Sequence, residues 1–132
     1  MIMGRILGIG VDVVDVVRMK EALQRQGDHF VRKVFTPAEV QYCRGKKKPH
    51  EHFAARFAAK EAVGKAIQTG WSGVFRWKDV EVMNEPSGAP RIILHNKMAE
   101  QLRTKHIHLS LSHSESTVIA FAVIESADAP PR

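Results

Sequence analysis

The chain has 132 residues, of which 44% are hydrophobic and 26% are charged, a composition typical of one globular domain. No apolar run approaches the ~20 residues that a membrane span requires, and the amino terminus lacks the pattern of a signal peptide. We therefore expect a cytoplasmic protein without a membrane partner. The single cysteine, Cys43, excludes an intrachain disulfide and a cysteine-based metal site.

The net charge of +6 is unevenly distributed along the chain. Residues 1–70 contain 13 Lys and Arg against 7 Asp and Glu, whereas residues 71–132 contain 7 of each. A basic surface favours an acidic partner, which can be a nucleic acid, an acidic protein or a phosphorylated small molecule. A solvated basic face without a partner gives the same charge pattern.

The first predicted element is a strand over residues 5–13, because apolar and small residues alternate there. One face carries Leu7, Ile9 and Val11, and the other carries Gly8, Gly10 and Asp12. Glycines on the second face leave room for a ligand or a backbone to approach, with Asp12 at its end. The alternative is a strand that lies against a helix, with a carboxylate that caps the following element.

Helical segments are predicted to follow the strand. Apolar spacing indicates a helix over residues 15–26, closed by Gly27, and a short helical piece around residues 30–34. Thr36, Pro37 and Glu39 have the spacing of a capping box with proline in the first turn, so a further helix is predicted to end near Cys43.

A basic loop over residues 44–49 separates this helix from a long one, predicted from His50 to Gln68 with Gly70 as its stop. Within the long helix four residues follow one another at intervals of four and are predicted to form its buried stripe: Phe53, Phe57, Glu61 and Lys65. A carboxylate on such a stripe needs a cation, a metal or a proton, which makes Glu61 a site candidate. The alternative is an ordinary surface pair of Glu61 with Lys65.

The second half of the chain has the pattern of a mostly antiparallel sheet. The predicted elements are strands over residues 79–84 and 91–94 joined by a turn, a helix that Asn96 caps and that runs through Lys105, and strands over 107–111 and 117–124. The expected fold is α+β, with a small antiparallel sheet packed against a long central helix and shorter helices. We expect a single domain over residues 1–125 and a flexible C-terminal tail over residues 126–132.

His113 continues the apolar face of its strand to the point where a turn with serines begins. An imidazole in this position can bind phosphate or relay a proton, although a histidine with a purely structural role is equally compatible with the pattern.

Three segments together resemble the short 4'-phosphopantetheinyl transferases, and among them the holo-[acyl-carrier-protein] synthases. The segments are Gly8-Ile9-Gly10-Val11-Asp12 with Arg18, Arg56-Phe57-Ala58-Ala59-Lys60-Glu61-Ala62 with Lys65-Ala66, and Ser110-Leu111-Ser112-His113. The resemblance covers residues 4 to about 125, and the helix motif is its most specific part.

The resemblance implies the phosphopantetheinyl transferase fold and transfer of 4'-phosphopantetheine from coenzyme A to a serine of apo acyl carrier protein, with Mg2+ as cofactor. Asp12 and Glu61 then correspond to the metal ligands, and Glu61, Lys65 and Asp12 to the catalytic residues. Mg2+ commonly takes one or two carboxylates and completes its octahedron with phosphate oxygens and water.

The resemblance also implies binding residues. Arg56, Lys65, His113 and Lys47 correspond to coenzyme A contacts, whereas Arg18, Arg25 and Phe57 correspond to a surface that docks the acidic carrier protein. The short enzymes are homotrimers with active sites at subunit interfaces, so a homotrimer is expected.

Two positions differ from the pattern. Gln68 stands where the family usually has glycine, and Val14 stands where longer members have a third acidic ligand.

Two other functions are compatible with parts of the sequence. A nucleic-acid-binding module fits the basic first half, but the strands lack aromatic residues interleaved with Arg and Lys, so no nucleic-acid partner is expected. A metal-dependent phosphohydrolase built on Asp12, Glu61 and His113 would instead cleave coenzyme A without a carrier.

Overall fold

The computed structural model describes residues 4–70 and 75–126. The elements follow the order β1 (Ile6–Asp15), α1 (Val16–Val34), α2 (Pro37–Arg44), α3 (Pro49–Gly70), a short 3-10 helix (Trp77–Asp79), β2 (Val80–Asn84), β3 (Pro90–Leu94), α4 (Asn96–Gln101), β4 (Lys105–His113) and β5 (Thr117–Ser126). Among these residues no helix is both long enough and apolar enough to span a membrane.

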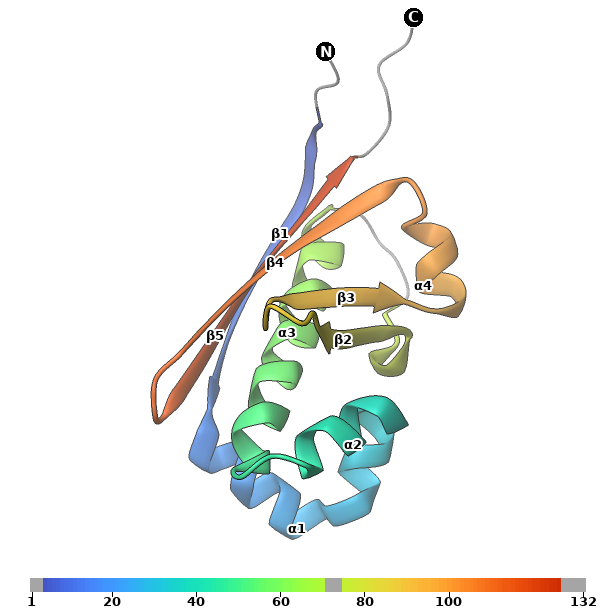
Figure 1. Ribbon diagram of the computed structural model, residues 1–132. Coiled ribbons are helices and arrows are strands. Elements are labelled where there is room, and N and C mark those ends of the chain that lie inside the picture. Colours follow the sequence, from blue (N-terminus) through green and yellow to red (C-terminus); the bar gives the residue numbers. More distant parts are fainter. Residues whose placement is uncertain (1–3, 71–74, 127–132) are drawn as a thin grey trace, which may run out of the picture.

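The strands form two antiparallel sheets. The larger sheet has the order β1-β5-β4, so the first strand of the chain pairs with the last, and β2 and β3 form a separate hairpin. Helix α3 runs across one face of the three-stranded sheet, and α1 and α2 cover one end of this helix (Figure 1). The predicted α+β class with an antiparallel sheet and a long central helix is confirmed, but the strands divide into two sheets.

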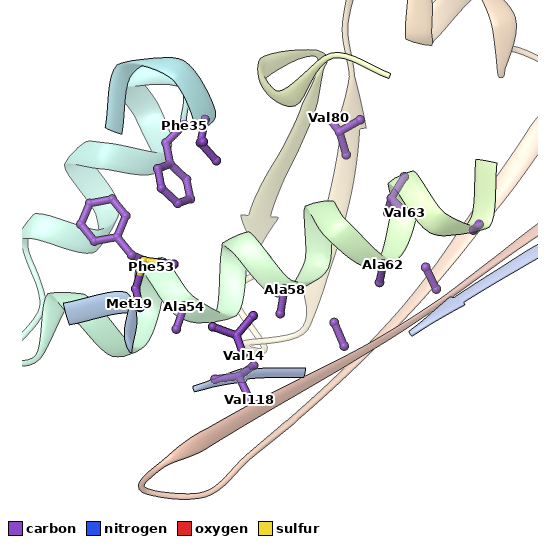
Figure 2. Packing of buried hydrophobic residues seen from close by; sticks show 14 of the residues in the cluster. Val14, Met19, Phe35, Phe53, Ala54, Ala58, Ala62, Val63, Val80 and Val118 are labelled. Atoms are coloured by element: carbon purple, nitrogen blue, oxygen red, sulfur yellow. The ribbon is translucent and has the colours of Figure 1, made fainter. Parts of the chain in front are cut away.

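The contact between α3 and the sheet is made by small side chains. A row of alanines on α3, each with no exposed surface, faces the sheet. Figure 2 shows Ala54, Ala58 and Ala62 on this side, and Ala66 continues the row beside Gly10 of β1. On β1, Gly10 allows the close approach, because a Cβ atom there would overlap the carbonyl oxygen of Ala62. Gly10 therefore accommodates the backbone of a helix, which is one of the two uses predicted for the glycine face of this strand.

The helical segments before α3 follow the predicted local signals. Gly27, with φ of 55°, kinks α1 at the point where the sequence predicts one helix to close and another piece to begin. The capping box of α2 is present, with Thr36 as N-cap and Glu39 at the third position. The carboxylate that caps α1 is Asp15, which accepts hydrogen bonds from Val17 N and Arg18 N.

Several predicted boundaries differ from the structure. Helix α4 ends at Gln101 instead of Lys105, and Asn96 is its first residue with φ of 53°, bonding Asp79 through its amide. Strands β4 and β5 are longer than predicted because they pair with each other over their whole length. Ser126 consequently belongs to β5 and not to the predicted tail, and residues 127–132 of that tail lie outside the described residues.

Candidate active site

Glu61 lies between two hollows on the surface of the molecule. The first, which we call the Arg18 hollow, has a volume of about 520 Å³ and is lined by Asp12, Val13, Val14, Asp15, Arg18, Met19, Ala22, Phe30, Phe57 and Glu61. The second, the Trp77 hollow, has a volume of about 240 Å³ and is lined by Glu61, Gly64, Lys65, Gln68, Phe75 and Trp77. Glu61 is the one residue common to both linings, so groups bound in either hollow would meet at its carboxylate.

Asp12 and Lys65 form the base of this region. The Lys65 Nζ atom donates to Asp12 Oδ1 at 2.9 Å and to the Val11 carbonyl oxygen at 3.1 Å. The Asp12 side chain is 14% exposed and that of Lys65 is 47% exposed. Strand β1 thus contributes a sheltered carboxylate and α3 contributes a cation that reaches it from solvent.

The predicted row of four on α3 is not the buried stripe of the helix. Phe53 is buried, Phe57 and Glu61 are half-buried, and Lys65 is exposed. The alanine row is offset by one residue, which is about 100° around the helix, and this row is the one that stays buried along α3. Glu61 is therefore placed at the edge of the core, where it meets solvent and Asp12.

The electrostatics of Glu61 reflect this position. Burial raises the pKa of Glu61, the nearby charge of Asp12 raises it further, and the cation of Lys65 partly opposes both. A carboxylate beside another carboxylate is stabilised in its charged form by an added cation. The pair therefore fits a hard divalent cation such as Mg2+, which accepts two carboxylate ligands and keeps water or phosphate oxygens at its other positions.

No further ligand joins this pair within residues 4–70 and 75–126, where no group of three or more His, Cys, Asp or Glu side chains is arranged to hold a metal. Val14, at the position where longer relatives of the predicted family have an acidic residue, is 9% exposed and packs in the core.

The three predicted docking residues are placed differently. Arg18 and Phe57 line the Arg18 hollow together with Asp12 and Glu61. Phe57 also stacks on Trp77 with ring centroids 5.3 Å apart and contacts Phe30 at 5.9 Å. Arg25 is exposed on α1 and is not among the residues that line this hollow.

The predicted coenzyme A contacts do not converge with Asp12 and Glu61 in the single chain. His113 lines a different hollow with His52, Glu51 and Ser114. Lys47 is exposed in the turn before α3. Of the predicted contacts, Lys65 alone lies beside Glu61 and Asp12.

Arg56 is 4% exposed, which the basic character of the motif did not predict. Its guanidinium lies 4.0 Å from the ring centre of Tyr42 and donates to Asn84 Oδ1 at 2.9 Å, and its Nε atom is buried without a hydrogen-bond partner. Cys43, in the same region, is fully buried, and burial raises the pKa of its thiol to about 11, which favours the protonated thiol over the thiolate.

Sequence reasoning missed Lys60, which has no exposed surface and pairs with Glu39 at 2.7 Å. A signal for its burial was present, because Lys60 lies three and seven residues before Val63 and Ile67, both buried, and seven residues after Phe53. The surface pair of Lys65 with Glu61, considered as an alternative from the sequence, is replaced in the structure by a pair of Lys65 with Asp12.

Comparisons with known proteins identify the family of the chain. Residues 8–122 match the family model described as the 4'-phosphopantetheinyl transferase superfamily. A holo-[acyl-carrier-protein] synthase of Koribacter versatilis is 46% identical over 123 residues, which cover 91% of this chain and 98% of that protein.

Solved structures show the same similarity. The holo-[acyl-carrier-protein] synthase of Neisseria meningitidis superposes with a TM-score of 0.82 at 33% identity and covers 92% of this chain and 100% of its own. A Bacillus anthracis enzyme of the same name, solved in complex with CoA (3',5'-ADP), has a TM-score of 0.76 at 35% identity, with 92% and 97% covered. The chain therefore belongs to the 4'-phosphopantetheinyl transferase superfamily.

Proposed function

We propose that the protein transfers 4'-phosphopantetheine from coenzyme A to a serine hydroxyl of apo acyl carrier protein, leaving adenosine 3',5'-bisphosphate. The observation that carries this proposal is that Asp12 of β1 meets Glu61 and Lys65 of α3, the helix with the most specific motif of the family. The names of the relatives and the coenzyme complex of one of them give the substrates. Coenzyme A and carrier proteins of fatty acid synthesis imply that the enzyme works in the cytoplasm.

The chemistry of the site follows from its charges. Glu61, whose pKa is raised by burial and by Asp12, is suited to take the proton of the attacking serine hydroxyl. Lys65 is placed to stabilise negative charge on the phosphate that is transferred. Mg2+, held by Asp12 and Glu61, would neutralise pyrophosphate charge.

The carrier is proposed to dock on the Arg18 hollow. Arg18 offers a cation at its edge, Phe57 and Phe30 offer an apolar floor, and Arg25 extends the basic surface along α1. An acidic helix with an apolar face would match both features. In this arrangement the serine of the carrier would approach Glu61 from the Arg18 hollow.

The coenzyme is proposed to bind between two subunits of a homotrimer. In one chain His113 and the Asp12–Glu61 pair line separate hollows, so the proposed contacts of one coenzyme are best joined by a neighbouring copy. Lys47 and Arg56 are assigned to the same coenzyme on resemblance alone.

An exposed apolar sheet face supports the proposed assembly. The outer face of β1 and β5 carries five large apolar side chains that are 43–62% exposed: Ile9, Val11, Val13, Ile119 and Phe121. Val11 pairs with Phe121 and Val13 with Ile119, so these side chains form one continuous patch. Patches of this kind on a small protein usually mark an interface.

The test is the intact mass of an apo acyl carrier protein after incubation with this protein, coenzyme A and Mg2+. A gain of one phosphopantetheine, absent with a serine-to-alanine carrier, is expected. Asp12→Ala and Glu61→Gln should abolish the gain across a range of Mg2+ concentrations. Cleavage of coenzyme A without a carrier would instead favour a phosphohydrolase, and full activity of either variant would refute the assigned roles.

A further inference from the structure

A buried ion pair lies directly behind Glu61. The neighbouring residue on α3, Lys60, has no exposed surface, and its Nζ atom donates to Glu39 Oε1 at 2.7 Å and to the carbonyl oxygens of Val34 and Trp77, each at 2.9 Å. An ammonium group has three protons, so all of its hydrogen-bonding capacity is used.

Glu39 is satisfied in the same way. Its Oε1 atom also accepts from Thr36 N at 2.9 Å, and its Oε2 atom accepts from Val82 N at 2.8 Å. The pair thereby joins α3 to the end of α1, to α2, to the Trp77 segment and to β2. Burial lowers the pKa of Lys60, and the charge and hydrogen bond of Glu39 oppose this shift.

These contacts end in the walls of both hollows at Glu61. The carbonyl oxygen of Trp77 accepts a hydrogen bond from Lys60, and Trp77 lines the Trp77 hollow. The indole ring of Trp77 stacks on Phe57, which lines the Arg18 hollow. Val34, on the other side, ends the helical turn that begins near Phe30, a further residue of the Arg18 hollow. Lys60 therefore binds the backbone of Trp77, which lines the Trp77 hollow, and is linked to the Arg18 hollow through Phe57, on which Trp77 stacks, and through the helical turn that contains Phe30 and Val34.

Lys60 and Glu61 are neighbours on α3. Adjacent residues of an α-helix point about 100° apart, so when the Lys60 side chain is held in place, the direction in which the Glu61 side chain points is also fixed. The buried alanine row alone offers a weak constraint on sliding or rotation, because its side chains are small and alike.

We propose that Lys60 is a positioning residue for Glu61, which acts by locking α3 to the walls of the two hollows through the Lys60–Glu39 pair. The inference rests on the role proposed above for Glu61. In this role Lys60 contacts neither the coenzyme nor the carrier. The buried Lys60–Glu39 pair instead holds the carboxylate of Glu61 in its reactive position.

The experiment compares Lys60→Met, Lys60→Arg and the double variant Lys60→Met/Glu39→Gln with the wild-type protein. Removing one partner leaves a buried charge unpaired, whereas replacing both partners by neutral groups of similar shape is often tolerated. We expect Lys60→Met to lose thermal stability and the double variant to regain much of it. Arginine retains the charge, but its planar fork cannot reproduce three bonds from one nitrogen.

The readouts that separate positioning from stability are turnover and metal binding. At a temperature at which each protein is folded, the double variant should keep a kcat about tenfold to a hundredfold below wild type. Calorimetric titration with Mg2+ in the presence of coenzyme A should show weaker binding in the same variant, while the KM for carrier changes little. Lys60→Arg should show the same pattern.

Leu102→Ala is the matched control, because Leu102 is 2% exposed in the core but follows α4, outside the contacts of Lys60. It should lose thermal stability while keeping the turnover and Mg2+ binding of wild type. A double variant with wild-type turnover and Mg2+ binding would overturn the proposal. If Lys60→Met does not fold, the double variant and Lys60→Arg decide the question. Full activity of Glu61→Gln would refute the role of Glu61 itself, which distinguishes that failure from this one.

Discussion

Lys65 donates a hydrogen bond to Asp12 Oδ1 at 2.9 Å, so a cation from α3 already lies on the carboxylate that we assign to the metal. Lys65 and a divalent cation would compete for the negative charge of Asp12. Lys65 therefore has two opposing effects, because it weakens metal binding at Asp12 but supplies a positive charge for the phosphate.

The first prediction concerns Lys65→Met. Turnover should fall about a hundredfold or more, because a charge that stabilises the reacting phosphate is lost. The Mg2+ concentration that gives half-maximal activity should fall at the same time, because Asp12 loses its competing cation. Steady-state kinetics over a Mg2+ series measures both, with Lys97→Met, an exposed lysine of α4, as the control. A higher Mg2+ requirement would contradict the competition.

The second prediction concerns the stability cost of Glu61. Its folded-state pKa is raised by burial and by Asp12, so above this pKa the ionised carboxylate destabilises the folded protein relative to the unfolded chain. Glu61→Gln should therefore raise the melting temperature at pH 7 by a few degrees in the presence of EDTA.

The raised pKa of Glu61 in the folded protein also determines how the effect of Glu61→Gln depends on pH. The difference between Glu61→Gln and wild type should shrink as the pH falls and Glu61 becomes protonated in both states. Differential scanning fluorimetry from pH 4 to 8 measures this, with the exposed Glu100→Gln as control. Addition of Mg2+ should raise the melting temperature of wild type more than that of the variant. Destabilisation by Glu61→Gln at pH 7 would disprove the account.

The third prediction concerns the close packing of β1 on α3. Gly10→Ala would place a methyl group on the Ala62 carbonyl oxygen, which is backbone and cannot move aside, so unfolding should become easier by about 3 kcal/mol or the protein should fail to fold. Gly45→Ala is the control, because a Cβ atom there meets its nearest neighbours at ordinary distances of 3.5 and 3.6 Å. Chemical denaturation compares the two, and equal stabilities would contradict the packing argument.

Local signals in the sequence predicted local structure well. The capping box of Thr36 and Glu39 and the break at Gly27 depend on residues that are close in the chain, and both are present. The raised pKa of Glu61 also agrees with the sequence, which predicts partial burial of this carboxylate on its helix. The predicted buried stripe is wrong, however, and the contribution of Asp12 was not predicted. The row that contains Glu61 leaves the core along α3, and Asp12 contributes to the perturbation from a strand far away in the sequence.

The remaining features depend on contacts that no local pattern encodes. Glu39 serves the capping box of α2, but its second oxygen binds β2 and its first binds Lys60, so one residue has three structural roles. His113 was expected with the other site residues, yet it lines a separate hollow in the single chain. Sequence order cannot show which residues of a site come from the same subunit.

The fourth prediction concerns carrier docking at the Arg18 hollow. Arg18→Glu should raise the KM for acyl carrier protein about tenfold or more and leave the KM for coenzyme A nearly unchanged, because it places like charges at the proposed interface. Arg91→Glu, which reverses an exposed arginine on β3, is the control. The effect of Arg18→Glu should diminish at high salt, where exposed charges are screened. Equal changes in both KM values would contradict a docking role.

The fifth prediction concerns the origin of His113 in the assembled enzyme. If the site joins His113 of one subunit to Asp12 and Glu61 of its neighbour, Glu61→Gln and His113→Ala subunits are each inactive as homotrimers but compensate in mixed assemblies. Random mixing should restore about a quarter of the sites, because each intact site needs one unmodified residue from each of two subunits. The expected activity after unfolding and refolding the two variants together is therefore about a quarter of wild type.

The controls for this mixing experiment separate assembly from chemistry. The two variants refolded apart and then combined should stay nearly inactive until subunits exchange, and a mixture of Glu61→Gln with Asp12→Ala should gain nothing, because both residues belong to the same side of the proposed interface. Native mass spectrometry verifies that mixed trimers form. Mixed trimers without recovered activity would contradict the proposal that one site takes His113 and Glu61 from different subunits.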